Sequence, residues 1–528
     1  MARAVAPTIA TGIAAGLVRN GAVLLAARGV AAVAGVVSVP VLYARLGERC
    51  YGVWALFTGL VTVAGLVDLG LGAAQIRAVA TAAEGGEQRH ARAVLAMGFV
   101  GGAGLAALAI ALTLLGWPAL ARMFHLGELS GQARGAALLL VVGFVLDSLA
   151  MPWRAVLEGT QHYGTLGWVT GGTALLGTAL VVLTALAGGG LVLLAASVAL
   201  TSAARAGLLC AAARGRVPDL FPRWRDISRC DVTSVLAYGI RVQASNAGAV
   251  ANNEMDRLVL GGFFDLPTLA GFDLGSRLVN LLRMLPSFAL PVLFPAAAAM
   301  VTAGESQGLN RLYLATTRLL AGFAAAGAAA LLVSADPLVR LWFGHPVPIA
   351  AQTIVVLAPG CAVSVVACAA GIVTRAEGFP GRETRCTVLA AVLNLALTIP
   401  LMRAFGPIGV PLATTVVVSL ITIYFFAHFH RDSHRQLRPL IHTLCPPLLA
   451  GAAAVAITWF VAARLPDGPG RGAAALAVVF RGGLAVLLVA VGLKVIGLCR
   501  NISRAHSPGA ATAVKARDHG ANDSREQP

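Results

Sequence analysis

The sequence predicts an all-α, polytopic membrane protein with about 14 transmembrane helices. Of its 528 residues, 58% are hydrophobic and only 12% are charged, whereas about 25% of a typical soluble domain is charged. The mean hydropathy is +0.81. Apolar runs of roughly 20 residues, long enough to cross about 30 Å of hydrocarbon as a helix, recur from residue 21 to residue 498. Barrel strands would instead give alternating segments of about 10 residues, so we expect helices.

The predicted spans follow one another with short polar connections. The first eight are expected at 21–43, 52–74, 93–116, 136–152, 164–186, 191–213, 234–258 and 268–299. The last six are expected at 314–335, 349–373, 385–402, 406–428, 442–463 and 473–498. The fourth span is short at its start, and the eleventh ends at Pro400, a residue type that interrupts helices.

Arginine is distributed unequally between alternate loops. The N-terminus and the loops on its side carry most of it, including the basic segment from Arg214 to Arg229. The loops on the other side carry only Arg45, Arg49, Arg122, Arg134, Arg340, Arg403, Arg464 and Arg471. Because positive loops are retained in the cytoplasm, we expect both termini there. The net charge of the chain is +17. Retention of positive loops in the cytoplasm explains this charge better than nucleic-acid binding does.

A weak internal repeat predicts two lobes. Arg28 precedes Leu46-Gly47, and Arg241 precedes Leu260-Gly261, at almost the same spacing. Duplicated halves around a polar cavity are a common transporter plan. The predicted organisation is a six-helix lobe (1–213), a basic cytoplasmic linker (214–233), a second six-helix lobe (234–430), helices 13 and 14 (431–499) and a disordered cytoplasmic tail (500–528).

The sequence predicts no enzyme, no cofactor and no metal site. Its eight cysteines are scattered and include no CxxC pair, which argues against a zinc site or a disulfide framework. His428, His430 and His434 follow the twelfth span, where a solvated, basic loop face is favoured over a metal site.

Charged side chains inside the spans are the strongest functional signal, because a charge in a lipid-spanning helix is costly and is retained where it faces protein, water or substrate. Five of them are predicted to share one depth, roughly 10 Å from the cytoplasmic ends of their helices. These five are Arg28, Asp68, Asp147, Arg205 and Arg241. The alternative is that the aspartates neutralise arginines within the bundle, or that long arginine side chains extend to the interface.

The seventh and eighth predicted helices hold a second concentration of charge. The seventh, which contains Asp256, is too polar to face lipid on all sides. Asp273 and Arg277 in the eighth are spaced for an intrahelical ion pair with a structural role. Arg283 has no acidic neighbour within one turn and is a candidate for binding an anionic ligand. Its alternative role is to donate hydrogen bonds to backbone carbonyls of a neighbouring helix.

Three segments also resemble a known family. They are LGERCYGVWALFTGLVTVAGLVDLGLGAAQIRAVA, the stretch from Met255 to Met300 with Asp256 and Pro295, and VLAAVLNLALTIPLMRAFGPIGVPLATTVV, which contains Asn394. In this order they resemble helices one and two, seven and eight, and eleven and twelve of Wzx-type polysaccharide flippases, which move O-antigen or exopolysaccharide repeat units. That family belongs to the multidrug/oligosaccharidyl-lipid/polysaccharide exporter superfamily.

The resemblance implies a flippase that moves a polyprenyl-diphosphate-linked oligosaccharide from the cytoplasmic to the outer leaflet of a bacterial inner membrane by alternating access. It also implies polysaccharide polymerase and export proteins as partners, and no nucleic acid. Arginine binds a diphosphate through its planar fork, and the predicted substrate-binding residues are Arg28, Arg241 and Arg283. The candidates for coupling to a proton or sodium ion, or alternatively for fixed counter-ions, are Asp68, Asp147 and Asp256.

Other function classes make different demands on the sequence. A cation-coupled drug or metabolite exporter of the same superfamily would share the fold but would usually have twelve spans and acidic cavity residues. A membrane-embedded polysaccharide polymerase or glycosyltransferase would need carboxylates and a sizeable external loop or domain for acceptor chemistry. The longest outer loop predicted, from Trp117 to Gly135, has one acid, Glu128. A non-transporting scaffold would not need ionisable residues at matching depths in both lobes.

Overall fold

The computed structural model consists of helices joined by short turns, and it describes residues 2–65, 71–220, 222, 254–464, 468 and 470–505. The prediction of an all-α protein is confirmed. The first half contains α1 (Ala2–Ala64), α2 (Leu71–Ala83), α3 (Gln88–Leu115), α4 (Trp117–Met123), α5 (Ser130–Gly159), α6 (Tyr163–Leu186) and α7 (Leu191–Arg216). The second half contains α9 (Leu266–Ala289), α10 (Phe294–Thr302), α11 (Ser306–Phe343), α12 (Pro348–Ala376), α13 (Pro380–Phe405), α14 (Gly409–Asp432), α15 (Leu437–Ala462) and α16 (Gly470–Ala505). A short helix over 254–263 precedes α9.

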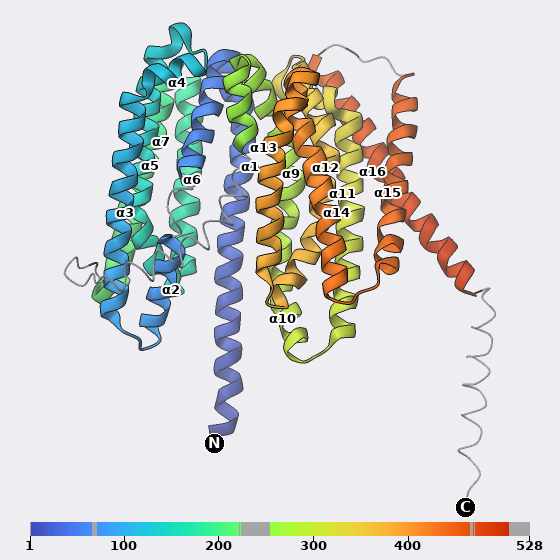
Figure 1. The fold of residues 1–528 in the computed structure, drawn as a ribbon, viewed down its shortest axis with the longest axis horizontal. Coiled ribbons are helices and arrows are strands. Elements are labelled where there is room, and N and C mark those ends of the chain that lie inside the picture. The colour runs from blue at the N-terminus through green and yellow to red at the C-terminus, as the bar shows by residue number, and fades with distance from the viewer. Residues whose placement is uncertain are drawn as a thin grey trace, which may run out of the picture.

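The first helix is bent at the predicted polar turn. Gly47 has φ 74° and ψ 169° inside α1, a conformation that is essentially restricted to glycine. The chain therefore turns back at the top of Figure 1 and descends through its second half, 48–64. Two of the predicted spans are thus the two arms of α1, with the N-terminus at the lower end of the first arm.

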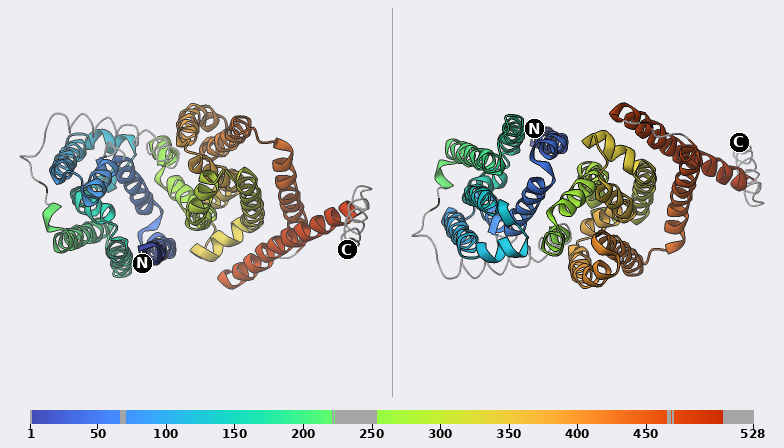
Figure 2. Two further views of the ribbon diagram at one scale, coloured as in Figure 1. Left: turned by 90° about the horizontal axis from the view of Figure 1, so that it is seen from below. Right: turned by 90° about the horizontal axis from the view of Figure 1, so that it is seen from above.

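The helices form two groups that lie side by side, as the views along their length show (Figure 2). The groups meet where α1 packs against α9. At this contact a Cβ atom on Gly52 would lie only 2.3 Å from the carbonyl oxygen of Leu266, so only glycine allows the two backbones to approach so closely. One hydrophobic core, which includes Tyr43 of α1 and Phe343 of α11, extends across the contact. The bend of α1, four residues after Tyr43, lies at the end of the molecule away from both termini (Figure 1).

The last two helices form an appendage to the second group. Both α15 and α16 pack against α11, and Figure 2 shows them at the outer edge of that group. This arrangement matches the expected extra pair of helices. The helix α16 continues to Ala505, past its predicted end at residue 498.

The outer surface of the bundle is apolar. Leu115, Trp168 and Leu319 are 83%, 77% and 73% exposed, and soluble monomers rarely present large apolar patches to water. Within the described ranges, nine helical spans are long and apolar enough to cross a bilayer, one of which, Gly381–Asp432, comprises both α13 and α14. The chain is therefore a multi-pass membrane protein, and the count of fourteen spans stays a prediction.

Several predicted boundaries are wrong. The fourth span begins at Ser130 and not at residue 136, since a short 3-10 turn leads directly into α5. The segment predicted as an outer loop from Trp117 contains the helix α4, which has a proline in its first turn, where a missing N–H costs nothing. The eighth span is interrupted after Ala289 by a 3-10 turn, Leu290–Leu293, next to three prolines, Pro286, Pro291 and Pro295.

Candidate functional site

A buried cluster of charges lies at the contact between the two groups of helices. The Asp273 side chain is fully buried and forms the predicted pair with Arg277, with 2.7 Å between Oδ2 and Nε. Arg257 approaches the other carboxylate oxygen to 2.8 Å, and its second terminal nitrogen lies 2.5 Å from Glu254. From α1, the Tyr51 hydroxyl donates a hydrogen bond of 2.7 Å to Asp273. The free-energy cost of burying the charged carboxylate of Asp273 is thus offset by two guanidinium groups and a hydroxyl.

A polar cavity of about 480 Å³ opens beside this cluster. It is lined by Glu254, Arg257, Asn280, Arg283, Met284, Ser287, Ser364, Val365 and Cys368. Its walls are the helix 254–263, α9 and α12. Gly59 of α1 adjoins this wall, because a Cβ atom there would lie 3.1 Å from Glu254 Oε2. The cavity therefore lies next to the interface between the two groups, with a volume typical of small-molecule sites, about 300–1,000 Å³.

Arg283 is the second arginine that lines this cavity. The first, Arg257, is bound to Glu254 and Asp273. The Arg283 residue is exposed and lies ten positions after Asp273, about 15 Å along α9. A guanidinium in such a position can bind a phosphate or carboxylate through two parallel N–H bonds.

A smaller cavity of about 70 Å³ connects the arginines with Asp256. Asp256 is only 4% exposed, and Thr414 of α14 donates a hydrogen bond of 2.6 Å to its Oδ2. The Asn394 side chain of α13 donates to Thr414 at 3.1 Å, and Thr398 donates to Asn394 Oδ1 at 2.9 Å. Within the part of the chain that the structure describes, no hydrogen bond reaches the other carboxylate oxygen, Oδ1, which is buried. Such an oxygen is costly while it is charged, so this position is suited to take up a proton or a small cation.

Asp147 has a different environment in the first group. Its carboxylate forms a two-pronged pair with Arg205 of α7, at 2.8 Å from Nε and 2.5 Å from Nη2. Ser202 donates a further hydrogen bond of 2.9 Å. The Arg205 side chain is 29% exposed and the Asp147 side chain is 37% exposed. The structure thus brings together two of the five charges predicted at one depth, in the arrangement expected for a fixed counter-ion.

The other predicted residues lie outside the described side chains. Arg28 is part of the helix α1, but its side chain is outside the described residues. Asp68 and Arg241 lie outside the described residues altogether. Their predicted roles are therefore still predictions.

Of the three histidines after the twelfth span, His430 differs from the expectation of a solvated loop face, whereas His434 is exposed. His430 is 2% exposed, and its Nε2 lies 3.0 Å from the Tyr313 hydroxyl. Arg435 stacks 4.9 Å from the Phe429 ring and binds Glu377 at 2.8 Å. This part of the sequence is therefore a packed junction between α11, α12 and α14. Within the ranges that the structure covers, no group of three or more His, Cys, Asp or Glu residues is arranged to hold a metal.

The two-group fold and its polar cavity can be compared with known proteins. The family described as "Polysaccharide biosynthesis protein" matches residues 42–346, more than half of the chain. The chain belongs to this polysaccharide biosynthesis family. The resemblance to Wzx-type flippases that the sequence indicated is thereby confirmed.

Individual relatives of this polysaccharide biosynthesis protein have related descriptions. The probable low-salt glycan biosynthesis flippase Agl15 of Haloferax volcanii is 24% identical over 199 residues, which are 37% of this chain and 41% of that protein. The chain thus matches about two fifths of the length of this curated relative. Among solved structures, the lipid II flippase MurJ in its inward closed conformation has a TM-score of 0.68 at 13% identity and covers 90% of this chain and 99% of its own.

A second fold relative is an inward-facing multidrug resistance transporter of the MATE family. Its TM-score is 0.63 at 15% identity, and the match covers 75% of this chain and 93% of that transporter. At such identities the two structures establish a common fold only. A fold of this kind hosts different cargoes, so the cargo has to be argued from the site.

Proposed function

We propose that this protein is a flippase that moves a polyprenyl-diphosphate-linked oligosaccharide from the cytoplasmic to the outer leaflet of a bacterial inner membrane, for surface polysaccharide synthesis. Both termini lie in the cytoplasm in this proposal, and polysaccharide polymerase and export proteins act on the delivered glycan. The chain itself performs transport and no catalysis.

The observation that carries the proposal is Arg283 in the 480 Å³ cavity at the interface between the two groups. A diphosphate is bound by guanidinium groups, and the lining of this cavity brings two of them together, those of Arg257 and Arg283. Arginine is preferred over lysine here, because it retains its charge away from bulk water and binds phosphate oxygens in pairs. In this proposal Arg28 and Arg241 contact the same diphosphate.

The interface supports transport by alternating access. The close packing of Gly52 on Leu266 follows five residues after the bend of α1, and this bend lies at the end of the bundle away from the termini (Figure 1). Arg283 lies 17 positions after Leu266, about 25 Å along α9 towards the other end. With cytoplasmic termini, the cavity would therefore receive its cargo from the cytoplasmic side while the outer side is closed. Rocking of the two groups would then release the contact between α1 and α9 and open the outer side.

Asp256 is the proposed coupling residue. Its buried Oδ1 has no hydrogen bond from any described residue, and the cavity that Asp256 lines is shared with Arg257 and Arg283. Entry of a proton or sodium ion at Asp256 would remove a negative charge next to these arginines and strengthen their hold on an anion. Departure of the cation would reverse this effect. The two binding events would thus be thermodynamically linked.

The experiment that tests the proposed function is depletion of the protein in its native host, followed by analysis of the lipid-linked intermediates. We expect a complete polyprenyl-diphosphate repeat unit to accumulate, accessible to enzymes only from the cytoplasmic side. Accumulation of repeat units in the outer leaflet would instead indicate a polymerase defect. An unchanged lipid-linked pool together with normal surface polysaccharide would contradict the proposal.

A further inference from the structure

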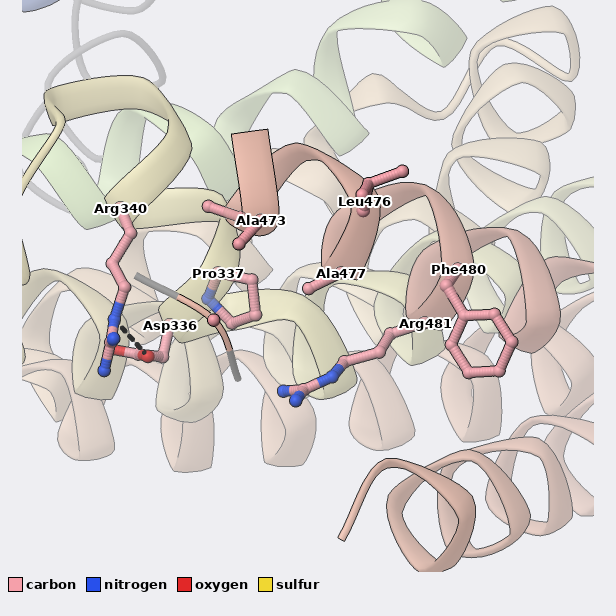
Figure 3. A pocket seen from close by; sticks show the side chains of 10 residues that line it. Asp336, Pro337, Arg340, Ala473, Leu476, Ala477, Phe480 and Arg481 are labelled. Atoms are coloured by element: carbon pink, nitrogen blue, oxygen red, sulfur yellow. Dashed lines mark ion pairs between the residues drawn. The ribbon is translucent and has the colours of Figure 1, made fainter. Parts of the chain in front are cut away.

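The two cavities of the candidate site meet at a common wall. Their volumes are about 480 and 70 Å³, and four described residues line both of them: Arg257, Asn280, Arg283 and Ser364. The cavity between α11 and α16, which Arg481 lines (Figure 3), shares none of these residues. Neither does the apolar cavity that α11, α12, α14 and α15 line. A ligand bound at Arg283 can therefore extend past Asn280 and Ser364 into the small cavity.

Asn280 lies next to Arg283 on the same face of α9. The two residues are three positions apart, about 4.5 Å along the helix, and both are exposed. The amide of Asn280 can donate through its NH₂ group and accept through its oxygen, whereas a guanidinium can only donate. Asn280 thus supplies an uncharged hydrogen-bonding group one helical turn from the arginine proposed to bind the diphosphate.

Ser364 of α12 adds an acceptor to the wall that the two cavities share. Its hydroxyl donates a hydrogen bond of 2.8 Å to the carbonyl oxygen of Cys361. Because a hydroxyl has a single proton, the Ser364 oxygen can then only accept from a ligand. Apolar side chains such as Val279 and Leu357 also line the small cavity. Together with the amide of Asn280, this cavity offers a donor, an acceptor and an apolar surface.

The size of the small cavity limits what can enter it. A volume of about 70 Å³ has room for a few groups of the size of a water molecule, which needs about 10–15 Å³, but not for a whole sugar ring. In a sugar diphosphate the diphosphate is attached to carbon 1, so the substituent on carbon 2 lies beside it. An acetamido group at carbon 2 has a carbonyl oxygen, an N–H and a methyl group. These three match the donor, the acceptor and the apolar surface of the cavity.

We propose that the first sugar of the cargo is a 2-acetamido sugar and that Asn280 and Ser364 recognise its acetamido group. This inference rests on the proposed function, with the diphosphate at Arg283 and the sugar ring in the 480 Å³ cavity. Asn280 donates to the acetamido carbonyl, and Ser364 accepts from the acetamido N–H. A hydroxyl at the same carbon lacks the second polar atom and the methyl group, so a sugar that carries it is bound less tightly.

The test compares two polyprenyl-diphosphate sugars that are identical except that one carries N-acetylglucosamine and the other glucose. Flipping is measured in proteoliposomes at low substrate concentration. We expect the unmodified protein to flip the acetamido substrate about fivefold faster, which is the effect of about one hydrogen bond. Asn280→Ala should lower this rate to that of the glucose substrate, and Ser364→Ala should also reduce the preference. The matched control is Asn310→Ala, which changes an asparagine of α11 that lines neither cavity and should keep the preference.

Failure of this inference can be distinguished from failure of the proposed function. Equal flipping of the two substrates by the unmodified protein would overturn recognition of the acetamido group, although flipping itself would support the proposed function. Full preference in a folded Asn280→Ala protein, or a loss of both rates by the same factor, would overturn it as well. Flipping of neither substrate by the unmodified protein would contradict the proposed function and this inference together. Arg283→Ala serves for comparison, since it should lower both rates equally.

Discussion

The Tyr51 hydroxyl donates a hydrogen bond of 2.7 Å to the carboxylate of Asp273, although the two residues are 222 positions apart in the chain. The bond joins α1 of the first group of helices to α9 of the second, and both side chains are completely buried. Because the same carboxylate binds Arg257 and Arg277, the hydroxyl connects α1 to the charged cluster beside the cavity. In the proposed transport cycle, this contact has to break each time the outer side opens.

Loss of this hydrogen bond should loosen the interface without disrupting the fold. Tyr51→Phe retains the ring and removes only the hydroxyl, so we expect a loss of about 1–2 kcal/mol in the stability of this closed form. The measurement is thermal unfolding, combined with alkylation of a cysteine introduced at Leu266. Tyr43→Phe is the control, since its hydroxyl bonds to the exposed Glu48 at 3.0 Å and should contribute less. Equal effects of the two changes would refute a special role of Tyr51.

A substitution at Gly52 that adds one methyl group should show how much the close approach of the two groups of helices matters. In Gly52→Ala the new Cβ atom would lie 2.3 Å from the Leu266 carbonyl oxygen, a backbone atom that cannot rotate away. We expect the interface to be forced apart and surface polysaccharide to be lost while the protein stays in the membrane. Gly35→Ala is the matched control on the same helix, because no atom of the described residues lies within 4 Å of its added Cβ. A normal polymer yield from Gly52→Ala would show that this contact is not part of the cycle.

Asp256→Asn should separate coupling from transport. The amide oxygen can still accept the hydrogen bond from Thr414, so the fold should be retained, but the position can no longer exchange a charge. We expect transport driven by a proton or sodium gradient to fall at least tenfold, whereas movement down the gradient of the cargo itself continues. The measurement is uptake into proteoliposomes with imposed ion gradients. A gradient response equal to that of the unmodified protein would exclude Asp256 as the coupling residue.

The pair of Asp147 and Arg205 should behave as a structural counter-ion pair. Asp147→Asn and Arg205→Gln should each destabilise the protein, because each leaves one partner with an uncompensated charge. The double variant should recover part of this loss, with a coupling energy of about 1 kcal/mol in a double-mutant cycle of thermal stability. Additive effects would mean that the pair does not act as a unit. If Asp147→Asn instead lost ion coupling while its stability stayed unchanged, a coupling role for Asp147 would be favoured again.

The sequence could predict those features of the site that depend on residues close together in the chain. The spacing of Asp273 and Arg277 alone indicated their ion pair, because residues four apart lie on one face of a helix. The apolar runs likewise predicted the helices, but the break after Ala289 was missed although three prolines in ten residues of the sequence point to it. The long-range partners could not be predicted, since nothing local to Tyr51 indicates that it meets Asp273.

Tertiary packing also decides which of the predicted charges form ion pairs. The sequence grouped Asp147 with the coupling candidates and left neutralisation as the alternative, and only the approach of α5 and α7 shows that Arg205 binds it. Arg481 was overlooked although it is a charge inside the fourteenth predicted span, the very signal that singled out other residues. His430 looked like a loop residue until its burial against Tyr313 placed it in the packed junction.

The most direct test is flipping of a purified polyprenyl-diphosphate oligosaccharide by the protein in proteoliposomes, measured as the rate at which its sugar becomes accessible on the opposite face. Arg283→Ala should lower this rate at least tenfold, since a charge-assisted bond to a phosphate contributes about 1.5–3 kcal/mol. Arg283→Lys should be intermediate, because it keeps the charge but not the fork. The matched control, Arg134→Ala, removes an exposed arginine outside the cavity and should flip at the normal rate. Normal flipping by Arg283→Ala would contradict diphosphate binding in this cavity.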